Sequence, residues 1–321
     1  MNRNISRGIK IVVFILIVTI TDKGLGHILS KLYFNQKEGN IHSLNYVLSE
    51  CKADVLIFGN SRAQHHYDPR IISAAMNMSC YNAGEDGGHS ILFPYAQIKI
   101  ITDRYSPRII ILEFSGVNNF QGAYDRLSIL LPYYKEYPEI RPLIQLRSRF
   151  ERIKLMSSIY PFNSDVIDIK RFRKDLTEEF EGYIPLKTKL NTDLLNSQPE
   201  IARQSEIATT VPDTNMINAL ENIIQICKSK NIALFIITSP NFHSVDEKQG
   251  PLSAATELAL DIIHRNQVTY LDFSFDPVFA GHPEWFADEV HLNEKGATIF
   301  SNMVTDSIRK TVGTYAKMKP N

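Results

Sequence analysis

The chain has 321 residues, of which 44% are hydrophobic, so it can bury a full core as one large domain or two small ones. Its 35 Lys and Arg residues balance 35 Asp and Glu residues, which gives no reason to expect a nucleic-acid partner or a polybasic membrane surface. Cys51, Cys80 and Cys227 are widely spaced, which excludes a metal-ligand spacing and an even-numbered disulfide framework. We expect buried thiols.

The N-terminus contains an apolar run over residues 11–20 that follows three basic residues. The run has about the length of a secretory h-region and is short for a membrane span, and a cleaved signal peptide, a short uncleaved signal anchor and a buried core helix are the alternatives. Basic residues before the run and none within it favour export. Because no Ala-x-Ala-like cleavage site follows, we expect residues 1–24 to be a signal anchor in the inner membrane. The rest of the chain would then be periplasmic, or extracytoplasmic.

Residues 25–50 are polar and mixed, and we interpret them as a stalk leading to a domain over 51–316. Within that domain, short β-rich runs alternate with helical patterns, which predicts a parallel sheet with crossover helices. The expected strands are 53–58, 79–82, 109–113, 232–238 and 268–272. The expected helices are 68–76, 90–104, 213–230, 252–265 and a last helix from near 294 to Gly313.

The alternation is interrupted over residues 120–212, which are rich in Tyr, Arg, Lys and Pro. This segment is too long for one structureless loop, so we expect a largely helical insertion or lid. The five strands and their helices predict an α/β fold, a three-layer α/β/α flavodoxin-like domain with a five-stranded parallel sheet.

Two short motifs carry candidate catalytic residues. Asp288 and His291 are three positions apart, so a short loop could bring the carboxylate against the imidazole, as in the acid and base of a nucleophilic triad. Ser61 follows a strand and a glycine, which puts its hydroxyl at the carboxyl edge of the sheet, where ligands bind in open α/β folds. Ser61 is therefore the expected nucleophile.

Four blocks resemble those of the SGNH (GDSL-type) hydrolase superfamily, in the family's order: Gly59-Asn60-Ser61-Arg62, Asn82-Ala83-Gly84, Gly116-Val117-Asn118 and Asp288-Glu289-Val290-His291. The resemblance covers about 53–118 and 213–312 and implies a Ser61 nucleophile, a His291 base and an orienting Asp288. It also implies an oxyanion hole made by the backbone N–H groups of Ser61 and Gly84 and the Asn118 side-chain amide. The chain departs from the family at Asn60 and Asn119, where Asp is usual.

Other residues near this edge could contact substrate. Arg62 could hold an anionic group or pair with a local carboxylate, and His65 and His66 follow closely. No third ligand has a suitable spacing for a metal, so we expect neither metal nor cofactor. Trp285 could stack on a sugar or anchor its loop.

Acyl transfer through an acyl-serine ester is the reaction implied by the resemblance. Membrane-anchored relatives often modify cell-envelope glycans, so we expect a serine esterase or O-acyltransferase acting on an acylated, especially acetylated, glycan or a small ester. A membrane-bound acyltransferase is a candidate partner. The alternative is a non-catalytic envelope binding or assembly module that keeps the fold.

Overall fold

The computed structural model describes residues 3–115, 124–164, 179–192, 212–247 and 249–318. The chain forms two compact units, which are described separately. One comprises Met1–Asn45 with Leu127–Asp175, and the other Tyr46–Arg126 with Leu176–Asn321.

The larger unit is built on a parallel sheet of five strands in the order β2-β1-β3-β4-β5. This is the strand order of flavodoxin-like doubly wound folds, so the predicted fold class is confirmed. The strands are β1 (Val55–Phe58), β2 (Cys80–Asn82), β3 (Ile109–Glu113), β4 (Ala233–Thr238) and β5 (Thr269–Asp272).

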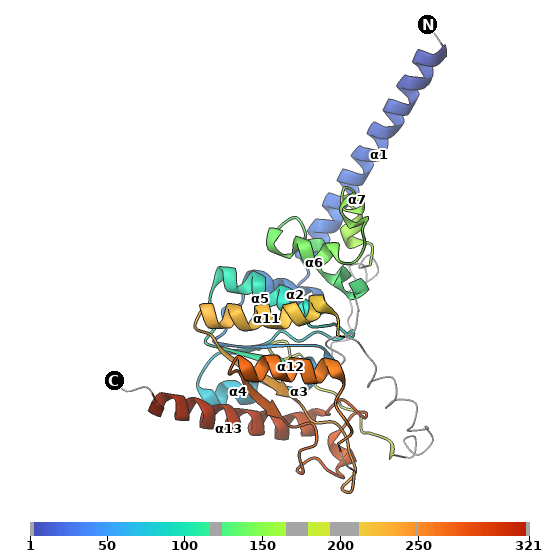
Figure 1. Cartoon of the computed structure of the whole chain (residues 1–321). Coiled ribbons are helices and arrows are strands. Elements are labelled where there is room, and N and C mark those ends of the chain that lie inside the picture. Colours follow the sequence, from blue (N-terminus) through green and yellow to red (C-terminus); the bar gives the residue numbers. More distant parts are fainter. Residues whose placement is uncertain (1–2, 116–123, 165–178, 193–211, 248, 319–321) are drawn as a thin grey trace. The chain divides into compact units, whose positions relative to one another are not determined.

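Helices cover both faces of this sheet (Figure 1). On one face α5 (Leu92–Arg104) packs against α11 (Thr214–Ser229), which also contacts α12 (Ala254–Arg265). On the other face α13 (Glu294–Met318) packs against α3 (Ser61–His66) and α4 (Pro69–Met76). The predicted three-layer arrangement is therefore confirmed.

The apolar pattern of the sequence explains these elements. All residues of β1 and β3 are buried, as expected for strands covered on both faces. The predicted apolar stripes of α11 and α13 are buried too: Met216, Leu220, Ile223, Ile224, Cys227, Ala297, Phe300, Val304 and Ile308. Gly313 does not end the last helix, which continues to Met318.

The predicted helix start and the predicted thiols are confirmed. Asp68 caps α4 by accepting a hydrogen bond from the Arg70 N–H, and Pro69 is its first helical residue. The three cysteines are buried and free. Burial raises the pKa of Cys227 to about 12, which keeps this thiol protonated and unreactive.

The smaller unit contains a long N-terminal helix, α1 (Arg3–Phe34). Its Arg7–Phe34 portion has 28 residues and is long and apolar enough to cross a membrane by length and composition. The described residues between 124 and 164 form short helices: η2 (Tyr124–Tyr133), η3 (Pro138–Ile140), α6 (Arg141–Gln145), α7 (Glu151–Lys154) and η4 (Tyr160–Phe162). A further helix, α2 (Gly39–Ser49), spans the boundary between the units.

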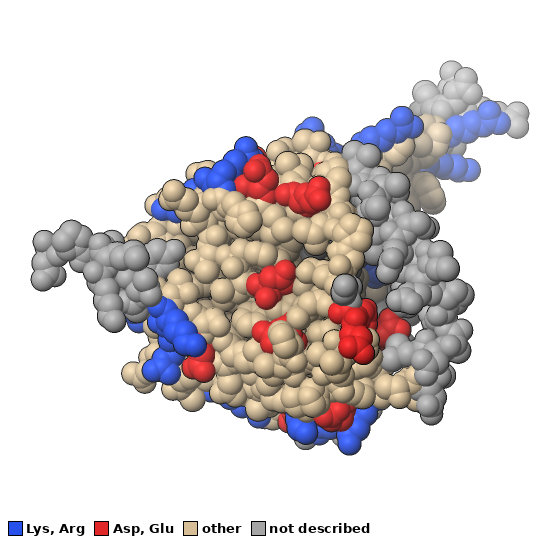
Figure 2. All heavy atoms as spheres, turned by 60° about the horizontal axis from the view of Figure 1, so that its bottom comes forward, with Lys and Arg blue, Asp and Glu red and all other residues tan. Residues whose placement is uncertain are grey.

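One face of the larger unit is shown in Figure 2. Acidic side chains lie near its centre, within a largely uncharged surface, and Lys and Arg side chains lie toward its edges. This face therefore carries no continuous basic area.

Candidate active site

The turn that presents Ser61 depends on a glycine. Gly59 follows β1 with φ +153°, and a Cβ at this position would lie 2.8 Å from the Glu113 Cβ. Only glycine allows so close an approach of the turn to β3. Ser61 is the first residue of α3, so its backbone N–H has no acceptor within the helix.

Asn60 caps α3, because its side-chain oxygen accepts a hydrogen bond from the Arg62 N–H at 3.1 Å. Its amide nitrogen lies 3.2 Å from the Ser115 hydroxyl, which follows β3. Asn and Asp are about equally good caps, so the departure from the family's usual Asp preserves the nucleophile turn.

Ser61, His291 and Asp288 form a continuous chain of hydrogen bonds. The Ser61 Oγ lies 2.8 Å from His291 Nε2, and His291 Nδ1 lies 2.8 Å from Asp288 Oδ2. A carboxylate only accepts, so His291 carries its proton on Nδ1 and leaves Nε2 to accept from the serine. The arrangement can therefore remove a proton from Ser61.

Asp288 is held ionised by its own loop. Partial burial raises the pKa of this carboxyl, but the Val290 N–H and the His291 ring and N–H, all hydrogen-bonded to it, outweigh burial and lower the pKa overall. Its side chain is 55% exposed and that of His291 is 21% exposed. The pair is therefore open to solvent from the carboxylate side.

The loop that carries this pair is a tight hairpin. Phe286 and Leu292 form an antiparallel bridge across it. The Trp285 carbonyl accepts the Asn293 N–H at 3.0 Å, and a Cβ on Gly296 would lie 2.1 Å from that carbonyl oxygen. The Trp285 ring stacks on His282 with centroids 4.0 Å apart, so this tryptophan anchors the loop.

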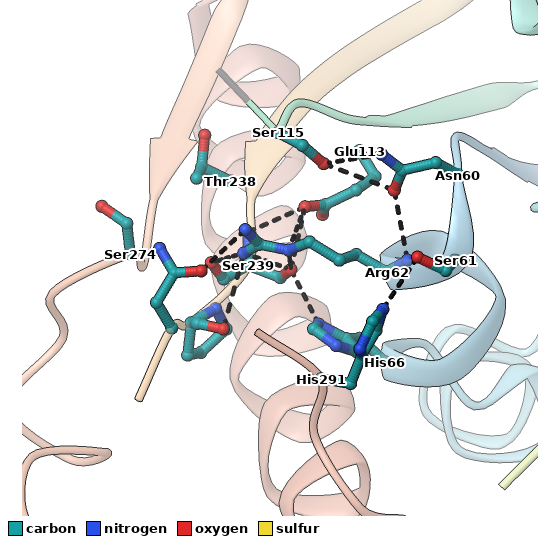
Figure 3. A network of polar contacts seen from close by, with 12 residues as sticks. Asn60, Ser61, Arg62, His66, Glu113, Ser115, Thr238, Ser239, Ser274 and His291 are labelled. Atoms are coloured by element: carbon teal, nitrogen blue, oxygen red, sulfur yellow. Dashed lines mark hydrogen bonds and ion pairs between the residues drawn. The ribbon is translucent and has the colours of Figure 1, made fainter. Parts of the chain in front are cut away.

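Arg62 does not reach toward substrate in this structure. It is 8% exposed, and its guanidinium forms an ion pair with Glu113 at 3.2 Å (Figure 3). It also donates to Ser239 Oγ at 3.0 Å and to Asn241 Oδ1 at 2.9 Å. Of the two expectations for Arg62, the structure therefore favours pairing with a carboxylate over contact with substrate: Arg62 ties the helix of the nucleophile to the ends of β3 and β4.

His66 is likewise buried rather than in contact with substrate. Its Nε2 accepts the Leu292 N–H at 3.0 Å, so Nδ1 carries the proton and donates to Ser239 Oγ at 2.8 Å. Burial lowers the pKa of His66 well below its usual value, and the charge of Arg62 lowers it further. A neutral His66 thus links β4 to the residue that follows His291.

Glu113 is the centre of this buried network. It accepts from the Ser239 hydroxyl at 2.8 Å and from the Tyr67 hydroxyl, in addition to its ion pair with Arg62. Burial raises the pKa of the Glu113 carboxyl, whereas Arg62 and the two hydroxyl donors oppose the rise. We did not predict Glu113 or Ser239 as site residues, although a carboxylate ending the apolar run of β3 is a sequence signal for a buried partner.

His65, another expected substrate residue, also lies next to His291. Its ring meets the His291 ring edge-on, with centroids 5.8 Å apart, and its Nδ1 is held by the Ile184 carbonyl at 2.8 Å. Burial lowers the pKa of His65, which favours a neutral ring at neutral pH.

The structure bears on the Gly84 N–H, one of the three expected oxyanion donors, but does not describe Asn118. The Gly84 N–H donates to the Asn82 side chain at 2.9 Å, and a Cβ on Gly84 would lie 2.5 Å from the Gln64 backbone nitrogen. Gly84 therefore serves close packing and its N–H is occupied, which corrects the prediction of a free donor. Asn118 lies outside the described residues, as do Gly116 and Asn119.

We searched the described parts of the chain for clusters of side chains that could bind a metal ion. Among those residues, no group of three or more His, Cys, Asp or Glu side chains is arranged to hold an ion.

Replacing His66 tests the link to the catalytic loop. His66→Leu should lower kcat for ester cleavage about 100-fold, because the Leu292 N–H loses its acceptor and the adjacent His291 shifts. KM should change little, since His66 is fully buried. Steady-state kinetics on a small activated ester would measure this, and an unchanged kcat in a folded variant would contradict the positioning role.

His89 should make stability depend on pH. It is 6% exposed and stacks on Phe93, and burial lowers its pKa to about 4. The unfolded residue titrates near pH 6.5, so below that pH the unfolded chain binds the proton more readily than the folded one. Between pH 7 and pH 5 this should remove about 2 kcal/mol of unfolding free energy.

Urea unfolding of the detergent-solubilised chain at the two pH values would measure that loss. His89→Leu should reduce the loss, whereas His264→Ala, which changes an exposed histidine, should leave it as in wild type. Equal pH dependence in the wild type and His89→Leu would contradict the assignment.

No protein-family model and no curated protein sequence matches the chain. Among solved structures, similar folds include an inferred acylhydrolase from Bacteroides fragilis, with 10% identity, coverage of 87% of this chain and 98% of the other, and a TM-score of 0.39. An acetyl xylan esterase shows 12% identity, coverage of 80% and 99%, and a TM-score of 0.38. A GDSL-like lipase from Bacteroides thetaiotaomicron shows 10% identity, coverage of 80% and 88%, and a TM-score of 0.33.

The TM-scores of these matches are low, so we assign the fold from the strand order of this chain and from the positions of its sequence blocks. The strand order is flavodoxin-like, one sequence block follows β1, a second follows β2, and the Asp-x-x-His block precedes the last helix. The chain therefore has a flavodoxin-like doubly wound α/β fold, with three of its four sequence blocks at the carboxyl edge of the sheet and before the last helix.

Proposed function

We propose that the protein is a serine esterase or O-acyltransferase that forms a covalent acyl ester on Ser61. The observation that carries this proposal is the hydrogen-bond chain from Ser61 through His291 to Asp288, with 2.8 Å at each step. A serine hydroxyl bonded to a neutral imidazole that a carboxylate orients is the arrangement that activates serine as a nucleophile.

The reaction would proceed in two steps. Ser61 Oγ attacks the acyl carbonyl carbon and its proton passes to His291 Nε2, which returns that proton to the departing alcohol as the ester bond breaks. Water or a second alcohol then gives its proton to His291 and attacks the acyl-Ser61 carbonyl. His291 returns that proton to Ser61 Oγ as the acyl–serine bond breaks. Asp288 stabilises the imidazolium in both steps.

For the oxyanion we propose the Ser61 N–H and the Asn118 side-chain amide as donors. The Ser61 N–H is available because this residue begins α3. A fixed donor aimed at the developing charge typically contributes about 3–4 kcal/mol to lowering the barrier.

An acylated, especially acetylated, cell-envelope glycan is our proposed substrate, with small esters as simpler substrates. Support comes from α1, a candidate membrane anchor, which would hold the larger unit at the membrane on the periplasmic or extracytoplasmic side. A membrane-bound acyltransferase would then be a suitable partner, because it could deliver the acyl group.

Hydrolysis and transfer can be separated with one assay. The full chain in detergent is given an activated acetyl ester, with and without an oligosaccharide acceptor, and both acetate and acetylated sugar are measured. Acetate alone supports an esterase, and acetylated sugar supports a transferase. Neither product above the Ser61→Ala background would contradict both and favour the non-catalytic module.

A further inference from the structure

An unusual apolar surface lies on the smaller unit, outside α1. Phe150, Ile153 and Met156 are 49%, 65% and 75% exposed, and they fall within seven consecutive residues around α7. Their spacing of three keeps them on one side of a helical turn. In the same stretch Glu151 and Leu155 are buried, so the segment turns its apolar side outward and a carboxylate inward.

On the inward side of this segment the buried Glu151 carboxylate has several polar partners, so the segment is held in place with its apolar side chains outward. The buried Glu151 carboxylate is paired with Arg147 and, at 3.2 Å, with Lys154. The Tyr160 hydroxyl donates to the same carboxylate. A firmly built segment that exposes three large apolar side chains indicates a contact surface.

The same segment is fastened to α1 where the apolar run of that helix ends. The Asp22 carboxylate accepts from the Ser157 hydroxyl at 2.5 Å and from the Ser158 N–H at 2.7 Å. Gly26, one turn further along α1, is buried against Ser158, where a Cβ would lie 2.4 Å from the serine Cβ. The exposed apolar surface is thus held at a fixed level along the helix.

Asp22 also ends the stretch of α1 that carries no charged residue, and this stretch is short. Only eleven residues separate Lys10 from Asp22. At 1.5 Å per residue they span about 16 Å, roughly half of a hydrocarbon core of about 30 Å. With Lys10 at the far boundary, Asp22 would fall short of the boundary where α1 leaves the bilayer. Its charge therefore needs partners, and Ser157 and Ser158 supply them.

We propose that Phe150, Ile153 and Met156 insert into the interface of the same lipid bilayer that α1 crosses, on the side where α1 leaves it. Charge favours this occupant, because the exposed Arg149 and Arg152 flank the apolar side chains. The Arg149 guanidinium lies 4.6 Å from the centre of the Phe150 ring, so a cation accompanies the aromatic group toward lipid phosphates.

The inference rests on the proposed anchoring of α1, and not on the proposed chemistry of Ser61. In this proposal the segment around α7, which we call the platform, attaches the protein to the membrane together with α1.

Tryptophan fluorescence in vesicles tests this contact directly. The full chain carrying Trp285→Phe is reconstituted in phosphatidylcholine and phosphatidylglycerol vesicles, and single tryptophans are placed by Ile153→Trp, Met156→Trp, Leu16→Trp and Glu136→Trp. Leu16 lies in the apolar run of α1, and Glu136 is an exposed polar position of the same unit. Emission is compared between vesicles with and without bromine on the lipid chains.

The proposal predicts loss of emission and a blue-shifted maximum at 153 and 156, as at 16, and neither change at 136. Quenching at 16 with none at 153 and 156 would overturn the platform while leaving the anchor intact. Absence of quenching at all positions would overturn both. Tryptophans at 153 and 156 that escape both lipid bromine and aqueous acrylamide would show a protein partner in place of lipid, and would also overturn it.

Discussion

Ser61→Ala should lower kcat for cleavage of an activated acetyl ester by about 10⁴-fold or more, because the acyl-serine step loses its nucleophile. This corresponds to roughly 5 kcal/mol or more of transition-state stabilisation. The hydroxyl is only partly buried and forms one hydrogen bond to His291 at 2.8 Å, so its removal should leave the fold and KM nearly unchanged.

A matched control is Ser274→Ala, which removes a buried serine hydroxyl near the carboxyl edge of the sheet. That hydroxyl donates to Asp272 at 2.6 Å and takes no part in the proposed chemistry. Its kcat should stay within a few-fold of wild type. An equal loss in both variants would indicate general damage, and no loss in Ser61→Ala would contradict the assignment of the nucleophile.

Arg62→Met should destabilise the protein by about 3–5 kcal/mol, because it leaves the fully buried Glu113 carboxylate without its ion-pair partner. Adding Glu113→Gln to Arg62→Met should recover part of this loss, since no buried charge then remains unpaired. Chemical unfolding monitored by circular dichroism would give the free energy of unfolding of each variant.

The control for this pair is Arg265→Met, which removes an exposed arginine that pairs with Glu221 at 3.3 Å and Asp261 at 3.5 Å. Exposed ion pairs contribute little, so the expected loss is below about 1 kcal/mol. Similar losses for Arg62→Met and Arg265→Met would mean that the buried network does not hold the nucleophile helix to the sheet.

The sheet was predictable because each of its strands is a short apolar run bounded by turn residues. The expected strand over 109–113 agrees with β3, and the helix expected over 68–76 begins at its predicted Asp68 cap. The end of α13 was not predictable from Gly313, because one glycine inside a helix costs only about 1 kcal/mol and does not by itself end it.

The candidate site was only partly predictable. The Asp288 and His291 contact is local, so its spacing suggested it, and Ser61 was expected from its position after a strand and a glycine. The partners of Arg62 and the buried role of His66 were not predicted, because their contacts with Ser239 are 177 and 173 residues away in the sequence. Only the tertiary fold decides whether such polar side chains point toward substrate or into the core.

The central claim, that His291 and Asp288 activate Ser61, is tested most directly by covalent labelling. The full chain is treated with a serine-reactive phosphonate and the labelled peptide is identified by mass spectrometry. The account predicts one adduct, on Ser61, that forms far more slowly in His291→Ala. A protein left unlabelled, or labelled equally fast in wild type and His291→Ala, would contradict it.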